Sequence, residues 1–271
     1  MRERRFAQVD VFSAEPLGGN PVAVVLDGEG LSGEEMQRFA TWTNLSETTF
    51  VLTPTAPDAD YRVRIFTGSR ELPFAGHPTL GTCHAWAGDA TPERVVQECA
   101  AGLIEIRRTP DGFAFAAPPL IRSGAVEPAL LAAVLEDLGV DDDAVLDAAW
   151  IDNGPGWLGV LLRSPDEVLA LEPRLTAHDD VGVAALAPDG ELEVRAFFRG
   201  PGGVGGEDPV TGSLNASLAG WLLESGRLAA PYVARQGTAL GRTGRVYVSQ
   251  DAGQVWIAGA TTTSIAGTVT L

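Results

Sequence analysis

Short apolar runs dominate the chain, many of them alternating with polar residues, and turn-forming glycine, proline, aspartate or asparagine residues separate them. Runs of this length and period are typical of β-strands joined by tight turns. The segments that predict strands are 9–12, 20–26, 47–52, 61–66, 94–99, 103–108, 113–118, 157–162, 181–186, 192–198, 232–236, 245–250, 254–259 and 264–271.

Helical spacing is confined to a few places. Ser32, followed by Glu35 three residues later, predicts a capping box at the start of a surface helix. A second surface helix is predicted over 127–138, where leucine and valine side chains form one stripe.

Two further helices, one in each half of the chain, are predicted to be largely buried. In the second, Leu214, Leu218, Trp221 and Leu222 recur at helical spacing. One is expected to begin at His77-Pro78 and the other at Asp208-Pro209. In the second, Asp208 is expected to act as the N-cap, with Pro209 at the first helical position, where a missing N–H costs nothing.

An internal repeat relates the two halves of the chain at an offset of 131 residues. YRVRIF at 61–66 matches LEVRAF at 192–197, and HPTLGTCHA at 77–85 matches DPVTGSLNA at 208–216. We therefore predict two homologous domains, 1–118 and 119–271. The predicted fold class is α+β, with two pseudo-symmetric domains, each a barrel-like, mainly antiparallel β-sheet around a central α-helix. The last strand, near 263–271, is a candidate to pack back onto the first domain.

Charge, apolar segments and cysteine usage argue against a nucleic-acid-binding, membrane or secreted protein. The chain has 271 residues and a net charge of −17, which disfavours binding to nucleic acid or to anionic membrane surfaces. Its start lacks the apolar segment of a signal peptide, and no apolar run approaches the ~20 residues that a membrane span requires. With only two cysteines, Cys83 and Cys99, a reduced cytoplasmic setting is expected.

The N-termini of the two buried helices are the candidate reactive centre. If a pseudo-twofold axis relates the domains, both N-termini are expected to face one cleft, with His77 and Asp208 on opposite sides. The glycine-rich approach at 202–206 and the small residues at 211–213 leave room for a carboxylate or a developing enolate at the helix N-terminus. The plainer alternatives are that Asp208 is only a cap and that His77 is a buried structural histidine.

A third candidate is Glu47, which follows a short turn and enters an apolar strand. A carboxyl group at a buried strand mouth would have a raised pKa and would exchange protons near neutrality. The alternative is a solvent-facing glutamate at the start of a strand. His84 and His178 are interpreted as structural or surface residues, and no metal site is predicted because no ligand cluster has the required spacing.

At these residues the sequence resembles the PhzF-like family, named for the phenazine-biosynthesis isomerase, within the diaminopimelate-epimerase fold. The resemblance runs nearly end to end. The segments that carry it, in order, are VDVF, PLGGNPVAVV, NLSETTFV, YRVRIFT, ELPFAGHPTLG, GGEDPVTGSLNASLA and GTVTL. It implies a homodimer and a reaction without cofactor on a small carboxylate substrate. In the phenazine enzyme, trans-2,3-dihydro-3-hydroxyanthranilate loses a proton from carbon 3 and gains one at carbon 1.

Carried over by motif, the resemblance implies a role for each candidate. Glu47 would move the proton, and His77 and Asp208 would hold and polarise the substrate. Ser213, with the amides of Gly212 and Thr211, would take its carboxylate; Gly76 belongs to the same binding set.

Relatives of this fold that racemise or epimerise use two facing thiols, one at each helix mouth. The corresponding places here read Ala75-Gly76-His77 and Glu207-Asp208-Pro209, without cysteine, so two-thiol epimerisation is excluded. The predicted function is a cofactor-independent isomerase. The alternatives are a small-molecule binding or regulatory protein with the same cleft and, less favoured, a structural protein.

Overall fold

The computed structural model describes residues 1–90, 92–199 and 205–271. They cluster into two compact units, of which unit 1 comprises 1–116 and 258–271 and unit 2 comprises 117–257. The last strand of the chain is thus grouped with the N-terminal residues, and it pairs there with the first strand.

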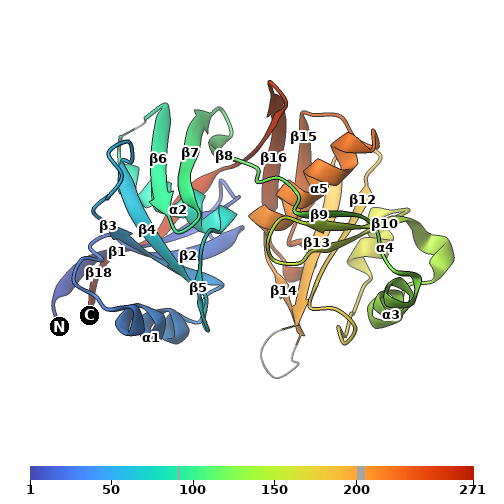
Figure 1. Ribbon diagram of the computed structural model, residues 1–271, viewed down its shortest axis with the longest axis horizontal. Coiled ribbons are helices and arrows are strands. Elements are labelled where there is room, and N and C mark those ends of the chain that lie inside the picture. Colours follow the sequence, from blue (N-terminus) through green and yellow to red (C-terminus); the bar gives the residue numbers. More distant parts are fainter. Residues whose placement is uncertain (91, 200–204) are drawn as a thin grey trace. The chain divides into compact units, whose positions relative to one another are not determined.

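Unit 1 is a mainly antiparallel sheet with a buried helix packed on it (Figure 1). Its strands are β1 (Glu3–Val11), β2 (Asn20–Val25), β3 (Glu47–Leu52), β4 (Tyr61–Phe66), β5 (Glu71–Leu72), β6 (Arg94–Cys99), β7 (Gly102–Thr109), β8 (Gly112–Ala116) and β18 (Thr261–Thr270). They pair in the order β18–β1–β2–β3–β4–β6–β7–β8, with β2–β3 and β4–β6 parallel, and β5 forms a hairpin with β4.

Two helices cover the sheet of unit 1. Helix α1 (Gly33–Thr43) begins with the predicted Ser32–Glu35 capping box, which is confirmed. Helix α2 (Gly76–Ala87) packs against β1, β2, β3 and β8 and is buried over its first eight residues. Gly81 permits this close packing, since a Cβ atom there would lie 2.3 Å from Cγ1 of Val22.

Unit 2 contains β9 (Arg122–Ala125), β10 (Val145–Asp152), β11 (Leu158–Leu162), β12 (Asp180–Leu186), β13 (Leu192–Arg199), β14 (Gly205–Asp208), β15 (Tyr232–Gln236), β16 (Gly244–Asp251) and most of β17 (Gln254–Gly259). Its α-helices are α3 (Pro128–Leu138), α4 (Pro165–Leu169) and the buried α5 (Gly212–Glu224), and short 3₁₀ turns lie at Asp142–Ala144 and Thr238–Leu240. Helix α3 confirms the helix predicted over 127–138.

Strands β1 to β7 of unit 1 and strands β10 to β16 of unit 2 pair in the same order, while the strand beside the first of them is the C-terminal β18 in unit 1 and the preceding β9 in unit 2. In unit 2 the pairing order is β9–β10–β11–β12–β13–β15–β16, with β11–β12 and β13–β15 parallel and β14 forming a hairpin with β13. The parallel pairs and the short hairpin therefore occupy the same places as in unit 1. This confirms the predicted fold class, α+β with two related halves, each with a central helix (Figure 1).

The offset between the halves changes inside the short hairpin. Arg64 on β4 pairs with Glu71 on β5, at 2.7 Å, and Arg195 on β13 pairs with Glu207 on β14, at 2.6 Å. The offset is therefore 131 at the arginines (64 and 195) and 136 at the glutamates (71 and 207). The connection in unit 2 is five residues longer and includes 200–204, which lie outside the described residues.

This shift overturns the predicted equivalence of His77 and Asp208. Asp208 stands opposite Ala196 on the neighbouring strand, as Leu72 stands opposite Ile65 in unit 1. Its counterpart in the repeat is therefore Leu72. A comparison at one fixed offset does not allow for the five inserted residues. His77 and Asp208 were aligned because a proline follows each of them.

The start of the second buried helix also differs from the prediction. Asp208 is the last residue of β14 rather than a helix cap, and α5 begins at Gly212 with Thr211 at its N-cap position. Because α2 begins at Gly76, Ser213 occupies the second helical position in unit 2 as His77 does in unit 1.

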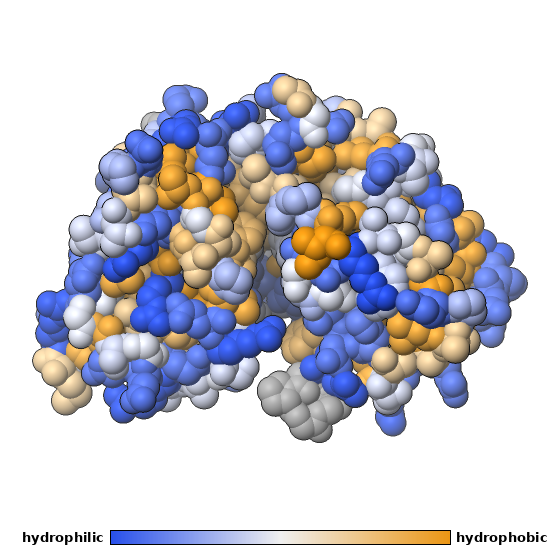
Figure 2. Space-filling view, viewed as in Figure 1, coloured by the Kyte–Doolittle hydropathy of each residue, from blue (hydrophilic) through white to orange (hydrophobic). Residues whose placement is uncertain are grey.

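Polar and charged side chains are spread over the surface shown in Figure 2, in keeping with the strongly acidic composition. Within the described residues, every helix is too short or too polar to cross a membrane.

Candidate functional site

Glu47 is placed by the parallel pairing of β2 and β3. It is the first residue of β3 and stands opposite Val22, directly after a turn in which Asn44 adopts a left-handed conformation with φ 56°. Its side chain is 15% exposed. Of the two alternatives for Glu47, the structure therefore favours the buried position at the start of a strand over the solvent-facing position.

His77 lies beside Glu47 at the second position of α2, with a side chain that is 5% exposed. Its ring hydrogen-bonds the backbone carbonyl of Pro21. Burial lowers the pKa of His77 from 6.5 to about 3, because the charged imidazolium loses its hydration there. The imidazole is therefore neutral at physiological pH.

The geometry fixes which ring nitrogen faces Glu47. Nε2 of His77 is 3.4 Å from Oε2 of Glu47 and makes no hydrogen bond that satisfies strict geometry, so Nδ1 carries the proton donated to Pro21. A neutral imidazole has one N–H only, and Nε2 therefore presents a lone pair to the carboxyl group. The carboxyl oxygen and this ring nitrogen therefore face each other at 3.4 Å without a hydrogen bond between them.

Folding stability is expected to depend on pH through His77. Its folded pKa, about 3, lies below the unfolded value of 6.5, so the unfolded chain binds the additional proton between these limits. The stabilisation is complete above pH 6.5 and is lost as the pH falls toward 3. Between pH 7 and pH 4.5 we expect a loss of about 2–3 kcal/mol from this residue.

Urea unfolding of the wild-type protein and of His77→Asn, at both pH values, measures this contribution. The asparagine side chain retains an amide donor for Pro21 but does not titrate, so the variant should lose less stability on acidification. Equal losses of stability in the two proteins would show that folding does not lower the pKa of His77.

In unit 2, Asp208 is held by the segment that leads into α5. The Thr211 hydroxyl donates to Oδ2 of Asp208 at 2.5 Å. Neither Thr211 nor Ala75, the N-cap residue of α2, makes a side-chain capping hydrogen bond. The two buried helices thus begin without the side-chain cap that Ser32 supplies to α1.

Gln236 on β15 organises this segment, and the sequence analysis did not single it out. It is fully buried, and its Nε2 donates to the Asp208 carbonyl and to the Thr211 hydroxyl, at 3.1 and 3.0 Å. Its Oε1 accepts from the Thr211 amide and from Nδ2 of Asn215, at 3.0 and 2.8 Å. Every hydrogen of the amide group is used, so the backbone around Asp208 is rigidly held.

Ser213 also has neighbours that the sequence analysis missed. The Trp157 indole N–H donates to the Ser213 hydroxyl at 3.1 Å, and Nδ2 of Asn153 donates to the Ser213 carbonyl at 2.9 Å. Both come from the loop between β10 and β11, more than fifty residues away in the chain. A lone tryptophan before an apolar strand carries no signal of this role.

The predicted residues thus form two groups. Unit 1 brings together Glu47, His77 and Gly76, and unit 2 brings together Asp208, Thr211, Gly212 and Ser213. Of the predicted glycine-rich approach, residues 202–204 lie outside the described residues, while Gly205 and Gly206 belong to β14.

The remaining histidines have structural partners, as predicted. The two ring nitrogens of His84 meet the hydroxyls of Thr261 and Thr263, at 3.0 and 2.9 Å, and Nε2 of His178 lies 2.7 Å from the Gly156 carbonyl. Cys83 is fully buried in α2, and burial raises the pKa of its thiol to about 12, so it offers no thiolate for proton transfer.

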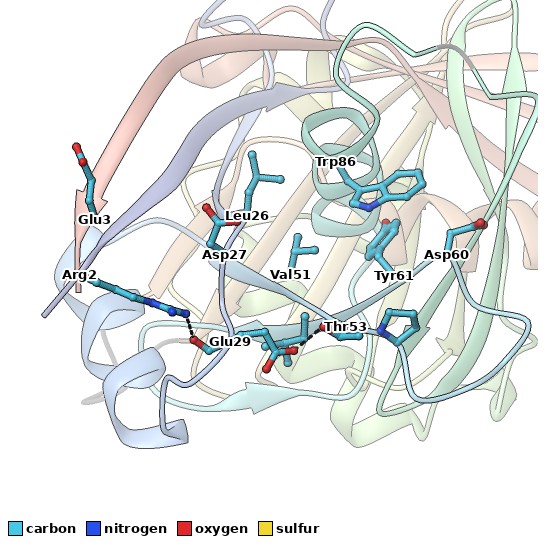
Figure 3. A pocket seen from close by; sticks show the side chains of 12 residues that line it. Arg2, Glu3, Leu26, Asp27, Glu29, Val51, Thr53, Asp60, Tyr61 and Trp86 are labelled. Carbon is cyan, nitrogen blue, oxygen red and sulfur yellow. Dashed lines mark hydrogen bonds between the residues drawn. The ribbon is translucent and has the colours of Figure 1, made fainter.

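Unit 1 also has an open hollow of about 530 Å³ on its surface (Figure 3). The rings of Tyr61 and Trp86 line it, with their centroids 5.1 Å apart. Its carboxylates already have protein partners: Asp27 pairs with Arg5, and Glu29 accepts from the Thr53 amide. None of the predicted site residues lines this hollow, and we do not assign it to the reaction.

Comparison with solved structures defines the class of fold. A PhzF-family phenazine biosynthesis protein from Bacillus anthracis superposes with a TM-score of 0.82 at 24% identity, over all of both chains. The fold is accordingly that of the PhzF and epimerase-like proteins.

Residues 9–267 match the family model described as "Phenazine biosynthesis-like protein", and the chain belongs to this family. It is 37% identical to the trans-2,3-dihydro-3-hydroxyanthranilate isomerase of Pseudomonas aeruginosa, over 90% of this chain and 89% of that protein. It is 36% identical to the protein named antisense-enhancing sequence 1 of Schizosaccharomyces pombe, over 98% of this chain and 99% of that one. With relatives named as isomerases across most of its length, the chain is an isomerase of this family.

Proposed function

We propose that this isomerase moves a proton within a small, unsaturated, carboxylate-bearing substrate, without a cofactor. The observation that carries the proposal is the buried contact between Glu47 and the neutral ring of His77. A carboxyl group held in a buried position beside a neutral imidazole can take a proton from a bound substrate and return one, as a general acid and base must.

Each group of residues has a role in the proposal. In unit 1, Glu47 takes a proton from one carbon of the substrate and returns one to another, while His77 keeps the carboxyl group oriented. In unit 2, Ser213 and the amide of Gly212 bind the substrate carboxylate at the start of α5, where N–H groups lack helical acceptors. The Thr211 amide, which was predicted to join them, donates to Oε1 of Gln236 instead. Asp208 polarises a polar group of the substrate.

The substrate class is proposed from the named relatives. The P. aeruginosa relative is a trans-2,3-dihydro-3-hydroxyanthranilate isomerase, and this compound is the first substrate to test. A homodimer and a cytoplasmic location, where Cys83 and Cys99 would remain thiols, complete the proposal.

Turnover in deuterium oxide tests the proposal. We expect trans-2,3-dihydro-3-hydroxyanthranilate to be consumed, and mass spectrometry of the product to show deuterium at the carbon that receives the proton from Glu47. A binding or regulatory protein would retain the compound unchanged and unlabelled. Recovery of unlabelled compound at saturating protein would therefore contradict isomerisation of this substrate.

A further inference from the structure

Ser213 has a hydrogen-bond geometry that determines which way its hydroxyl proton points. A serine hydroxyl has one hydrogen to donate and two lone pairs that accept, whereas an indole nitrogen can only donate. In the 3.1 Å contact with Trp157, the serine oxygen is therefore the acceptor. Its hydrogen is directed elsewhere, and no protein acceptor for it is recorded among the described residues.

The donor is itself firmly held. Trp157 is 4% exposed, and its carbonyl accepts from the Ile151 amide at 3.0 Å. The loop before it is closed by Asp152, whose Oδ1 accepts from the amides of Gly154 and Gly156, both at 2.7 Å. The indole N–H is thus presented from a rigid loop rather than from a mobile side chain.

The equivalent place in unit 1 has the opposite polarity. His77, at the same helical position as Ser213, donates to the Pro21 carbonyl and so leaves a lone pair on Nε2. In unit 1 the second residue of the buried helix contacts Pro21 at the start of β2, and in unit 2 it contacts Trp157 directly before β11. The Pro21 carbonyl takes the one N–H of His77 and leaves Nε2 as an acceptor toward Glu47. The Trp157 indole N–H occupies a lone pair of Ser213 and leaves its hydroxyl hydrogen to be donated.

We propose that Trp157 is a positioning residue that makes the Ser213 hydroxyl an obligatory donor to the substrate carboxylate. This inference rests on the proposed function, in which Ser213 binds that carboxylate. The Ser213 amide, in the first turn of α5, donates in parallel, so the anion is held at two points. Asn153 supports the arrangement by fixing the Ser213 backbone carbonyl.

A double-mutant cycle tests the coupling. Binding of 3-hydroxyanthranilate, an aromatic carboxylate of the substrate's shape, is measured by calorimetry for wild type, Trp157→Phe, Ser213→Ala and the double variant. Loss of a hydrogen bond to a charged ligand predicts a rise in Kd of about 30-fold for Ser213→Ala. For Trp157→Phe we expect about tenfold, since the hydroxyl is still present but no longer oriented.

The diagnostic result lies in the double variant. If Trp157 acts through Ser213, adding Trp157→Phe to Ser213→Ala changes Kd by less than about twofold. The neutral amide 2-amino-3-hydroxybenzamide should bind Trp157→Phe and wild type with nearly equal affinity. Trp221→Phe is the matched control, because it is the same substitution at a tryptophan of α5, two turns beyond Ser213. It should leave the affinities for the acid and for the amide unchanged.

Each other outcome decides against one of the two claims. Additive effects, or an equal loss of affinity for the acid and the amide, would overturn the role of Trp157 while the proposed function stands. Failure of the wild-type protein to bind 3-hydroxyanthranilate would contradict the carboxylate site itself. If Trp157→Phe does not fold, 3-benzothienylalanine at position 157 keeps the ring shape and replaces the N–H by sulfur.

Discussion

Glu47→Gln is expected to lower kcat by about three orders of magnitude or more, because one group both removes and returns the proton. The glutamine side chain is close to isosteric, and its amide can donate to Nε2 of His77, which faces position 47 at 3.4 Å. The pair therefore keeps its geometry and loses only its transferable proton. Affinity for 3-hydroxyanthranilate and the melting temperature should stay near the wild-type values.

Glu34→Gln is the matched control, since Glu34 is an exposed residue in the first turn of α1 of the same unit. Its kcat should equal that of the wild type. Steady-state turnover and calorimetric binding separate the two effects. A Glu47→Gln protein that retained more than a tenth of the wild-type kcat would remove Glu47 from the proton-transfer step.

Arg195→Met is expected to destabilise the protein by about 3–5 kcal/mol, because it leaves the Glu207 carboxylate buried without its partner. The two side chains are 8% and 9% exposed. Arg195 also donates to the carbonyls of Val168 and Leu171, at 3.1 and 2.7 Å, so its loss removes one donor from each of these carbonyls. The strand that ends at Asp208 would lose this side-chain contact with β13 and keep its backbone pairing.

The internal repeat provides the control for this prediction. Arg64 and Glu71 occupy the same places in unit 1, but their side chains are 33% and 38% exposed. Arg64→Met should therefore cost less than about 1 kcal/mol, since water can solvate the remaining carboxylate. Urea unfolding followed by circular dichroism measures both. Equal costs would show that burial of the Arg195 pair does not determine its contribution.

Local pattern was sufficient for most of the strands and for the surface helices. The capping box at Ser32 and the apolar stripe over 127–138 depend on residues three or four positions apart, and both helices are present. Strand β10 was missed because its sequence, VLDAAWID, is rich in alanine and aspartate, which have low strand propensity. Pairing with β9 and β11 on either side makes it a strand.

The error at Asp208 has a different origin. An Asp-Pro pair before an apolar run is a common helix start, and the sequence does not show that a neighbouring strand competes for the same residues. Pairing of β14 with β13 extends to Asp208, so the helix begins four residues later, at Gly212. Tertiary pairing overrode the local signal, and with it the apparent match to His77.

By itself the sequence determined the α+β class, the duplication and the residues that carry the family motifs, because these follow from short-range pattern and residue identity. The tertiary structure alone decided the protonation of His77 and its orientation toward Glu47. His77 is neutral because folding removes water from it, and it faces Glu47 because two elements distant in the chain pack together. Desolvation and contact between distant residues are properties of the folded chain, and no local pattern records them.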